Sequence, residues 1–315
     1  APVTAYKFIH FEINEGSTWS VAFKRLIINS HILPYKLDWL HFGYAVTGIQ
    51  RELVGKAIKA KVAVSFRGHD IIEYPQKHPG CYDRLWKNIN KVHTISDDLL
   101  RQAYLLGLSN ETKVIKITPA ISCEIFNYKR QNFFNWNVIK IVTVARLNWA
   151  KGLGYILDAL AQLKNTGINF HYKIIGDGPE MEYLSFSVYQ LGLLKNVELI
   201  GKLEHSQIPF ILQENDIYIQ YSIREGFCNA VLEAQSAGLL CIVSDAEGLS
   251  ENVIDNKTGW VVPKRRPDLL ANKIIEVINM PMEQLLSISH AASERVRNEF
   301  NLEKQKRDFV NFYND

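Results

Sequence analysis

A short apolar run followed by a segment of helical spacing recurs at least five times in the second half of the chain. The first such pair is 139–147, which is rich in β-branched residues, and 151–167, where leucine and isoleucine recur every three or four positions. Further strands are predicted at 170–176, 196–201, 216–222 and 239–245, and further helices at 178–193, 206–214 and 224–234. Alternation of this kind, with short turns, is typical of a parallel sheet covered by helices on both faces. It predicts an α/β fold.

The N-terminal half shows the same alternation less regularly. Strands are predicted at 37–43, 60–68, 91–96 and 112–119, and helices at 46–58 and 97–107. Residues 6–13 alternate between apolar and polar types, and this period predicts one more strand. From residue 266 to the end the spacing is helical.

A chain of 315 residues is too long for one ordinary hydrophobic core, so two domains are expected. Segment 123–137 is polar and aromatic without a clear period, and it is interpreted as the linker. We therefore expect an N-terminal Rossmann-like domain over 1–130, a C-terminal Rossmann-like domain over 131–282, and terminal helices over 283–315 that pack back toward the first domain. In open sheets of this type, ligands bind at the carboxyl ends of the strands.

Composition and charge exclude several classes of protein. The net charge of +3 is a mild bias that does not indicate nucleic acid, but it suits an anionic ligand or an anionic membrane surface. The four cysteines form no CxxC pair, and unpaired cysteines in a chain of this size favour a reducing compartment, hence the cytoplasm. No uncharged apolar run approaches the roughly 20 residues that span a bilayer. The chain begins without methionine, so processing or a longer parent protein is expected.

Two cations stand at the turn after the strand 139–147. Arg146 ends the strand and Lys151 opens the next helix, in the segment "VARLNWAKG". Arginine can contact two phosphate oxygens at once and lysine adds a point charge, so this pair suits a diphosphate. The alternative is a solvated pair of cations beside a helix start.

The segment "IIGDGPE" reads as strand, tight turn and helix. Gly176 and Gly178 would let the backbone approach a ligand closely, and Pro179 would begin the helix. An efficient turn without a ligand explains the same residues equally well. The third glycine of a dinucleotide fingerprint is missing.

The segment "REGFCNAVLEA" places one carboxylate on each side of a glycine turn. Gly226 gives the turn, after which the N–H groups of Phe227 and Cys228 would point out of a helix N-terminus, an end that favours phosphate. Glu225 would repel a bare phosphate there, so it is expected to face hydroxyl groups. Glu233 lies one helical turn past Asn229 and is expected to face the same cleft. A helix cap with exposed glutamates is the alternative, and it leaves the spacing unexplained.

The second half resembles the nucleotide-sugar-binding domain of the retaining glycosyltransferases of family 4, which have the GT-B fold. Five segments occur in the family's order, namely "VARLNWAKG", "IIGDGPE", "EGFCNAVLEA", "AGLLCIVSD" and "EGLSENVIDNKTGWVV". The resemblance covers about residues 138–280. It implies two facing Rossmann-like domains with the donor site in the cleft between them.

The same resemblance implies a role for each matching residue. Arg146 and Lys151 would contact the donor diphosphate, beside the close turn of Gly176 and Gly178. Glu225 would face the donor sugar and Glu233 would hold the ribose. The remaining donor contacts would come from the backbone N–H groups of Gly226 and Phe227, from Asn229, and from the backbone of loop 201–205 with Lys202 and Leu203, which would read the base.

The first half carries a weaker match. The segment "SFRGHDI" is similar to the family's strand-end HGxD segment, in which a histidine approaches the donor sugar. Arg67 stands in the place of that histidine, where it could stabilise phosphate charge but could not release a proton. His69 is next in line and is the other candidate. No strand–loop–helix unit is predicted before residue 37, so the acceptor lobe is expected to be truncated or reduced.

These features together predict a hexosyltransferase that moves a sugar from a nucleoside-diphosphate sugar to an acceptor hydroxyl with retention. A polysaccharide or lipid-linked glycan acceptor is expected, with peripheral contact to the inner face of a membrane. No metal is required, because no DxD motif ends a strand and the cations with the helix end would offset the leaving charge. One alternative is a non-catalytic module that binds a nucleotide sugar or a partner subunit. A dinucleotide-dependent oxidoreductase lacks the full fingerprint.

Overall fold

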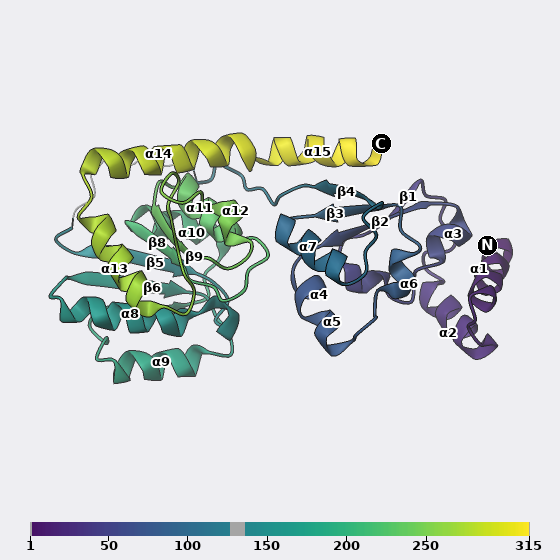
Figure 1. Ribbon diagram of the computed structural model, residues 1–315, viewed down its shortest axis with the longest axis horizontal. Coiled ribbons are helices and arrows are strands. Elements are labelled where there is room, and N and C mark those ends of the chain that lie inside the picture. The colour runs from purple at the N-terminus through teal and green to yellow at the C-terminus, as the bar shows by residue number, and fades with distance from the viewer. Residues whose placement is uncertain (1, 127–135, 315) are drawn as a thin grey trace. The chain divides into compact units, whose positions relative to one another are not determined.

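The computed structural model describes residues 2–126 and 136–314 of the chain (Figure 1). They divide into two compact units: the first contains Ala1–Thr118 together with Arg307–Asp315, and the second contains Pro119–Lys306. The predicted boundary at residues 130 and 131 lies outside the described residues. Among the described residues, no helix combines the length and the apolar character needed to cross a membrane.

The second unit is built on one parallel sheet with the strand order β10-β9-β8-β5-β6-β7. Its strands are β5 (Ile139–Val144), β6 (Phe170–Ile175), β7 (Val197–Gly201), β8 (Ile217–Gln220), β9 (Leu240–Ser244) and β10 (Trp260–Val262). The five strands predicted in this half are confirmed. Among them β8 and β9 are buried at every position, which is typical of short apolar runs in the middle of a parallel sheet. The three-residue edge strand β10 was not predicted, since it is too short to show a period.

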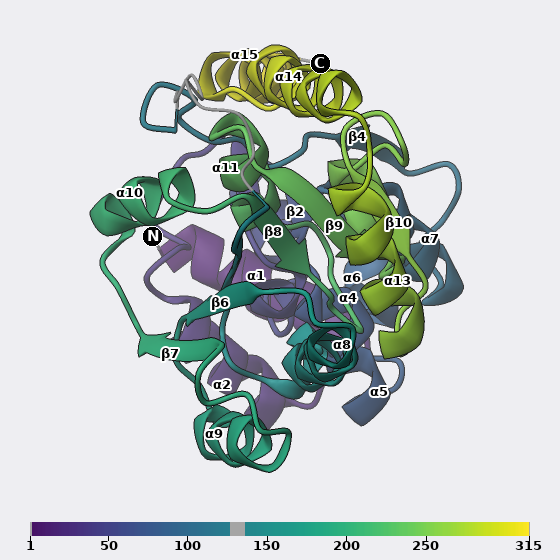
Figure 2. The ribbon, with the colours of Figure 1, turned by 90° about the vertical axis from the view of Figure 1, so that its left-hand side faces the viewer.

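Helices cover both faces of this sheet. They are α8 (Leu153–Asn165), α9 (Met181–Gln190), α10 (Ile208–Gln213), α11 (Asn229–Ser236), α12 (Leu249–Asn252), α13 (Pro267–Ile278) and α14 (Met282–Glu299), with 3₁₀ turns at η2 (Trp149–Lys151) and η3 (His205–Gln207). α8 contacts both α9 and α13 on one face, whereas α11 contacts α14 on the other (Figures 1 and 2). The core between these layers consists of fully buried aliphatic side chains, with Tyr172, Tyr221 and Trp260 as its largest members.

The first unit contains a smaller parallel sheet with the order β1-β2-β3-β4. Its strands are β1 (Trp39–Phe42), β2 (Lys61–Phe66), β3 (Lys91–Thr94) and β4 (Lys113–Lys116). The remaining elements are α1 (Pro2–Asn14), α2 (Trp19–Asn29), η1 (Ala45–Gly48), α3 (Val54–Ile58), α4 (His69–Ile72), α5 (Tyr74–Lys77), α6 (Asp83–Trp86) and α7 (Asp97–Leu105). Four of the five strands predicted for this half are confirmed.

The strand predicted at residues 6–13 is wrong, because this segment lies inside helix α1. Its buried positions are Phe8 and Glu12, which are four residues apart and therefore lie on one face of a helix. Glu12 is fully buried and its carboxylate accepts from Arg25 at 2.7 Å and from Arg84 at 2.9 Å. This tertiary ion pair holds α1 on the unit and makes the apparent alternation of the segment coincidental.

The last helix, α15 (Leu302–Asn314), belongs to the first unit from Arg307 onward. Phe312 is fully buried there with Ala63 of β2 and Ile117. The Lys91 ammonium of β3 donates to the carbonyl oxygen of Phe312 at 2.6 Å. The end of α15 therefore closes one face of the four-stranded sheet.

A chain of hydrogen bonds runs beneath this helix across three strands. Ser65 Oγ lies 2.8 Å from His41 Nε2 and 2.8 Å from His93 Nδ1, and His41 Nδ1 contacts the Tyr313 hydroxyl at 2.5 Å. His93 Nε2 completes the chain on the carbonyl oxygen of Ile117 at 2.9 Å. Burial, with Arg67 nearby, lowers the pKa of each histidine to about 4. Both rings are therefore neutral in the folded unit near pH 7.

We expect the first unit to lose stability as the pH falls from 6.5 to 4. The pKa of His41 and of His93 is lowered on folding, so the unfolded chain binds protons first. The stabilisation is complete above pH 6.5 and is lost as the pH falls through about 4, at a slope on the order of 1 kcal/mol per pH unit. Urea titrations at pH 7, 6, 5 and 4 measure it.

The variant His93→Gln should flatten this pH dependence, because glutamine cannot titrate. His290→Gln is the matched control, since that side chain is 71% exposed on α14. An equal slope in wild type and His93→Gln would contradict the assignment of the pH dependence to this chain of hydrogen bonds.

Candidate functional site

Loops that follow four neighbouring strands carry most of the residues predicted to bind a donor. β8, β5, β6 and β7 are adjacent and parallel, so their carboxyl ends meet at one edge of the sheet. A pocket of about 610 Å³ opens at this edge. Its lining residues are Val144, Ala145, Arg146, Ile175, Gly176, Asp177, Gly178, Lys202, Leu203, His205 and Ile208. The structure thus brings Arg146, the two glycines and loop 201–205 together, as the sequence predicted.

The two glycines of the turn after β6 allow two loops to touch. A Cβ atom on Gly176 would lie 1.8 Å from the carbonyl oxygen of Ala145, and one on Gly178 would lie 2.3 Å from that of Leu147. Any other residue would push the loop after β6 away from the loop after β5. The glycines therefore shape the pocket wall by close backbone packing.

Lys151 and Glu225 form a direct ion pair in this unit. Lys151 Nζ donates to Glu225 Oε2 at 2.5 Å, and Ser222 Oγ donates to the same oxygen at 3.1 Å. The side chains are 20% and 12% exposed, so the pair is largely shielded from water. The sequence analysis expected both residues in one site, with Lys151 at the diphosphate and Glu225 at the donor sugar. It did not predict a contact between them.

Backbone packing brings the two partners of this pair together. Gly152 has a φ of +62°, and a Cβ atom there would lie 2.2 Å from the carbonyl oxygen of Tyr221. Directly beside it, the N–H of Ile223 donates to the carbonyl oxygen of Ala150 at 2.7 Å. The loop after β5 is therefore fixed against the loop after β8, and Lys151 faces Glu225 as a result.

The electrostatics of the pair keep the lysine charged. Burial alone would lower the pKa of Lys151, but the adjacent Glu225 carboxylate raises it above its usual value. The ammonium therefore remains a cation at neutral pH, with two further hydrogens available to a ligand.

Hydrogen bonds from Gly248 and Asn252 fix the backbone of the loop that carries Glu225. The N–H of Gly248 donates to the carbonyl oxygen of Glu225 at 2.8 Å. Asn252 donates to the carbonyl oxygen of Cys228 at 3.0 Å and accepts from its N–H at 3.0 Å. The prediction that the Cys228 N–H points toward a ligand is therefore wrong, because an asparagine 24 positions later uses it.

The other N–H groups of this turn differ from that of Cys228. Within the described part of the chain, the N–H groups of Gly226 and Phe227 form no hydrogen bond, which leaves them open to an anion at the start of α11. The Phe227 ring is buried against Phe300 at a centroid distance of 5.7 Å, which anchors the turn. Asn229 is exposed at the first position of α11.

Glu233 lies on α11 and is paired with a residue that the sequence analysis did not assign. Its Oε1 is 3.1 Å from His205 Nε2, and His205 also lines the 610 Å³ pocket. Burial raises the pKa of Glu233, and the hydrogen bond from His205 opposes that shift. His205 could have been found from the sequence, because it is a titratable residue in loop 201–205, directly after a predicted strand.

Arg67 and His69 belong to the first unit, at the end of β2. Arg67 is exposed and its Nε donates to the carbonyl oxygen of Gly43 at 3.3 Å. His69 Nδ1 is hydrogen-bonded to the Tyr44 hydroxyl at 2.9 Å. Asp70 is fully buried and accepts from the N–H groups of Arg67 and Gly68, so its role is to fix the loop.

The polar groups of the second unit define what its site can hold. Exposed Arg146 and paired Lys151 offer positive charge, whereas Glu225 and Glu233 offer acceptors for hydroxyl groups. Among the residues that the structure describes, no group of three or more His, Cys, Asp or Glu side chains could hold a metal ion. The arrangement suits a ligand that combines phosphate with hydroxyl-rich rings.

Two relatives show what the chain is similar to. AmsK of Erwinia amylovora, an amylovoran biosynthesis glycosyltransferase, is 30% identical over 288 residues, which are 87% of this chain and 69% of the relative. WcaL of Escherichia coli strain K12, provisionally named a colanic acid biosynthesis glycosyltransferase, is 27% identical over 288 residues, covering 88% and 70%.

The fold is shared with solved glycosyltransferase structures. Anabaena HepE, in a complex with UDP and glucose, superimposes with a TM-score of 0.78 at 18% identity, over 94% of this chain and 83% of HepE. The predicted GT-B class, with two parallel-sheet domains, is thereby confirmed. The family of Glycosyl transferases group 1 matches residues 124–295, more than half of the chain, and the chain belongs to this family.

Proposed function

We propose that this chain transfers a hexosyl group from a nucleoside-diphosphate sugar to an acceptor hydroxyl and retains the anomeric configuration. The observation that carries the proposal is the Lys151–Glu225 pair, set beside the open N–H groups at the start of α11. A cation and a helix end suit the diphosphate, and the carboxylates suit the hydroxyls of sugar and ribose. HepE and the pneumococcal O-GlcNAc transferase GtfA, which share the fold, were each crystallised with UDP, which supports a nucleotide-sugar donor here.

In the proposed reaction, the bond between the anomeric carbon and the β-phosphate oxygen breaks and the nucleoside diphosphate leaves. The acceptor oxygen bonds to the same face of that carbon, and its proton passes to an oxygen of the leaving diphosphate. Lys151, Arg146 and the N-terminus of α11 offset the negative charge that develops, so the proposal needs no metal. Glu225 would hold donor-sugar hydroxyls, Glu233 would hold the ribose, and loop 201–205 would contact the base.

For Arg67 and His69, we propose contacts on the acceptor side of the transferred sugar. The exposed Arg67 guanidinium would stabilise phosphate charge, whereas His69, held by Tyr44, would approach hydroxyl groups. The alternative is a non-catalytic module that binds the nucleotide sugar without transfer, which the arginine in place of histidine favours. The paired Glu225 favours the enzyme.

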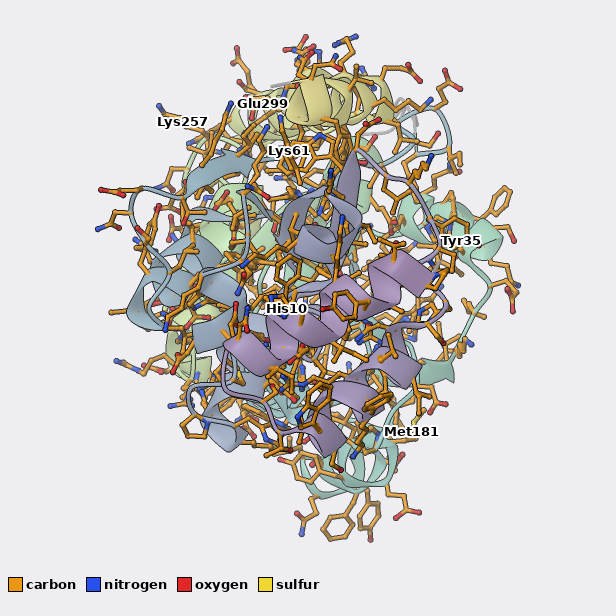
Figure 3. All side chains as sticks on the ribbon, turned by 90° about the vertical axis from the view of Figure 1, so that its right-hand side faces the viewer. His10, Tyr35, Lys61, Met181, Lys257 and Glu299 are labelled. Carbon is orange, nitrogen blue, oxygen red and sulfur yellow. The ribbon has the colours of Figure 1, made fainter. Side chains whose placement is uncertain are left out.

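We further propose that the acceptor is a polysaccharide or lipid-linked glycan and that the first unit contacts a membrane. AmsK and WcaL are named for polysaccharide synthesis. Trp19, Phe23 and Ile27 recur every four residues on α2 and are 64%, 51% and 71% exposed. Figure 3 shows the helices α1 and α2 face-on, with side chains projecting from them. Exposed Lys24, on the neighbouring face of α2, adds positive charge, which suits an anionic bilayer surface.

We expect Glu225→Gln to reduce the rate of sugar transfer by about 10²-fold or more, because the neutral amide removes the negative charge of the carboxylate that is proposed to face the donor sugar. First, titration calorimetry with UDP-, GDP- and ADP-sugars selects the donor, and product formation and donor hydrolysis are then measured. Glu214→Gln is the matched control, since Glu214 is 60% exposed and pairs with Lys173 away from the pocket lining. Wild-type rates in Glu225→Gln would remove this carboxylate from the mechanism, and donor binding without any turnover in wild type would favour the non-catalytic module.

Lys151→Ala should weaken binding of the selected nucleoside diphosphate by about tenfold or more, yet leave binding of the nucleoside unchanged. The substitution removes a cation and also leaves the Glu225 carboxylate unpaired, and both changes weaken the binding of a phosphate group. Calorimetry on the two ligands measures the difference, with Lys173→Ala as the control lysine. Equal losses for nucleoside and diphosphate would show that Lys151 does not contact phosphate.

Replacing Trp19, Phe23 and Ile27 together by alanine should reduce co-sedimentation with vesicles that contain anionic phospholipid by about tenfold. The stripe supplies the apolar area, and salt should weaken the remaining electrostatic attraction. The control removes three equally exposed apolar side chains from the second unit, namely Phe186, Tyr189 and Leu194, at 57%, 66% and 66% exposure. If the control variant loses as much binding as the α2 variant, the first unit is not the membrane contact.

A further inference from the structure

A second pocket lies beside Lys151 on the second unit. It has a volume of about 320 Å³ and shares no lining residue with the 610 Å³ pocket. Its lining residues are Trp149, Gly152, Leu153, Gly154, Tyr155, Asp158, Glu180, Tyr183 and Ile223. They come from η2, the first turns of α8, the start of α9 and the loop after β8. The proposed donor site uses none of these side chains.

Aromatic side chains give this pocket flat apolar surfaces that are exposed to solvent. Trp149 is 53% exposed and Tyr183 is 56% exposed, whereas Leu153 and Ile223, which line the same pocket, are buried. Gly154 makes room for one of these rings, because a Cβ atom there would lie 3.0 Å from the Tyr183 hydroxyl oxygen and 3.4 Å from a ring carbon. The tyrosine ring therefore lies directly over the first turn of α8. In Figure 3, side-chain rings project from the helix that begins at the labelled Met181.

Two carboxylates, those of Asp158 and Glu180, line the same pocket. In the described part of the chain, neither the Asp158 nor the Glu180 carboxylate forms an ion pair or a side-chain hydrogen bond. Partial burial raises the pKa of each. The described residues that line the pocket include no lysine or arginine, so an anionic ligand such as a diphosphate would be repelled. The free acceptors instead suit a ligand that donates hydrogen bonds.

A pyranose ring combines these properties, because its C–H face packs on aromatic rings and its hydroxyl groups donate to carboxylates. The pocket is also next to the proposed site along the chain, since Trp149 precedes Lys151 by two residues and Ile223 precedes Glu225 by two. Both junctions are fixed by the hydrogen bond from the Ile223 N–H to Ala150. A ligand held here would therefore be positioned by the same loops as the Lys151–Glu225 pair.

We propose that this pocket is a carbohydrate subsite that holds one hexosyl residue of the acceptor or product glycan. The proposal rests on the proposed function, which supplies a glycan as the second substrate. It assigns Trp149 and Tyr183 as stacking surfaces, and Asp158 and Glu180 as hydroxyl acceptors. An organic cation would also be attracted to aromatic rings and carboxylates, and the experiment separates the two ligand classes.

The test uses the full chain and three neutral trisaccharides, composed of glucose, galactose and mannose, observed by saturation-transfer NMR and titration. At least one should bind with a dissociation constant of about 1 mM, a value typical of a small polar contact area. Trp149→Ala with Tyr183→Ala should weaken that binding about tenfold or more, with unchanged thermal unfolding and unchanged nucleoside diphosphate binding. Phe186→Ala with Tyr189→Ala, on the same helix α9, is the matched control and should bind as wild type.

A second variant separates a sugar from a cation. Asp158→Asn with Glu180→Gln keeps oxygen acceptors for hydroxyl groups but removes both charges, so trisaccharide binding should change by less than about threefold. A nucleotide sugar without glycan should not protect Trp149 from quenching by acrylamide, whereas the trisaccharide should. This arm distinguishes the glycan from the donor's own sugar as the occupant.

Three results would overturn the subsite. They are no trisaccharide binding to wild type below about 10 mM, binding that survives loss of both rings, and binding of tetramethylammonium in place of the sugars. If these occur while nucleoside diphosphate binding and transfer are intact, the subsite fails alone. If the trisaccharide binds at the aromatic rings but no nucleotide binds, the proposed function fails and the sugar site stands.

Discussion

The contact between the loop after β5 and the loop after β8 is the constraint on which the arrangement of the second unit depends. Parallel pairing of β5 with β8 puts both loops at one edge, but the approach of Gly152 to the Tyr221 carbonyl sets their distance. The hydrogen bond from Ile223 to Ala150 then fixes their register. This backbone contact therefore determines how Lys151, which follows β5, and Glu225, which follows β8, are placed in the proposed donor site.

The Lys151–Glu225 pair is a consequence of that contact, and its energetics suit binding better than stability. Burying two charges has a desolvation cost that a single ion pair often only offsets. The Ser222 hydroxyl donates one hydrogen bond to the Glu225 carboxylate. The Lys151 ammonium has three hydrogens and uses one on Glu225, so it can also donate to a ligand. A pair of this kind is neutral as a unit, so a diphosphate in the proposed donor site would meet the lysine without full repulsion from the glutamate. This resolves the difficulty that a lone carboxylate at a helix N-terminus would pose.

Sequence patterns predicted those parts of the structure that local physics determines. Nine of the ten strands are short, largely apolar runs bounded by turn residues, and the turn glycines mark close backbone approaches, so these features were predictable. Residues 6–13 were mispredicted because the ion pairs of Glu12 with Arg25 and Arg84 arise only in three dimensions. Likewise, the partners of Cys228 and Glu233 stand 24 and 28 positions away, and no period in the sequence links them. The His41–Ser65–His93 chain combines three strands and is equally invisible to pattern analysis.

The loop 146–152 contributes side chains to two pockets that differ in charge. Arg146 lines the larger pocket, where glycine loops leave backbone and cations exposed. Trp149 lines the smaller one together with two carboxylates, and no lysine or arginine is among its described lining residues. Lys151 lies between them in sequence, held by Glu225. A single loop can therefore present positive charge to an anionic ligand and an apolar surface to a neutral one, because Arg146 lines one pocket and Trp149 lines the other. Glycans and diphosphates differ in this same property of charge, so one edge of one sheet can discriminate between them without a rearrangement of the backbone.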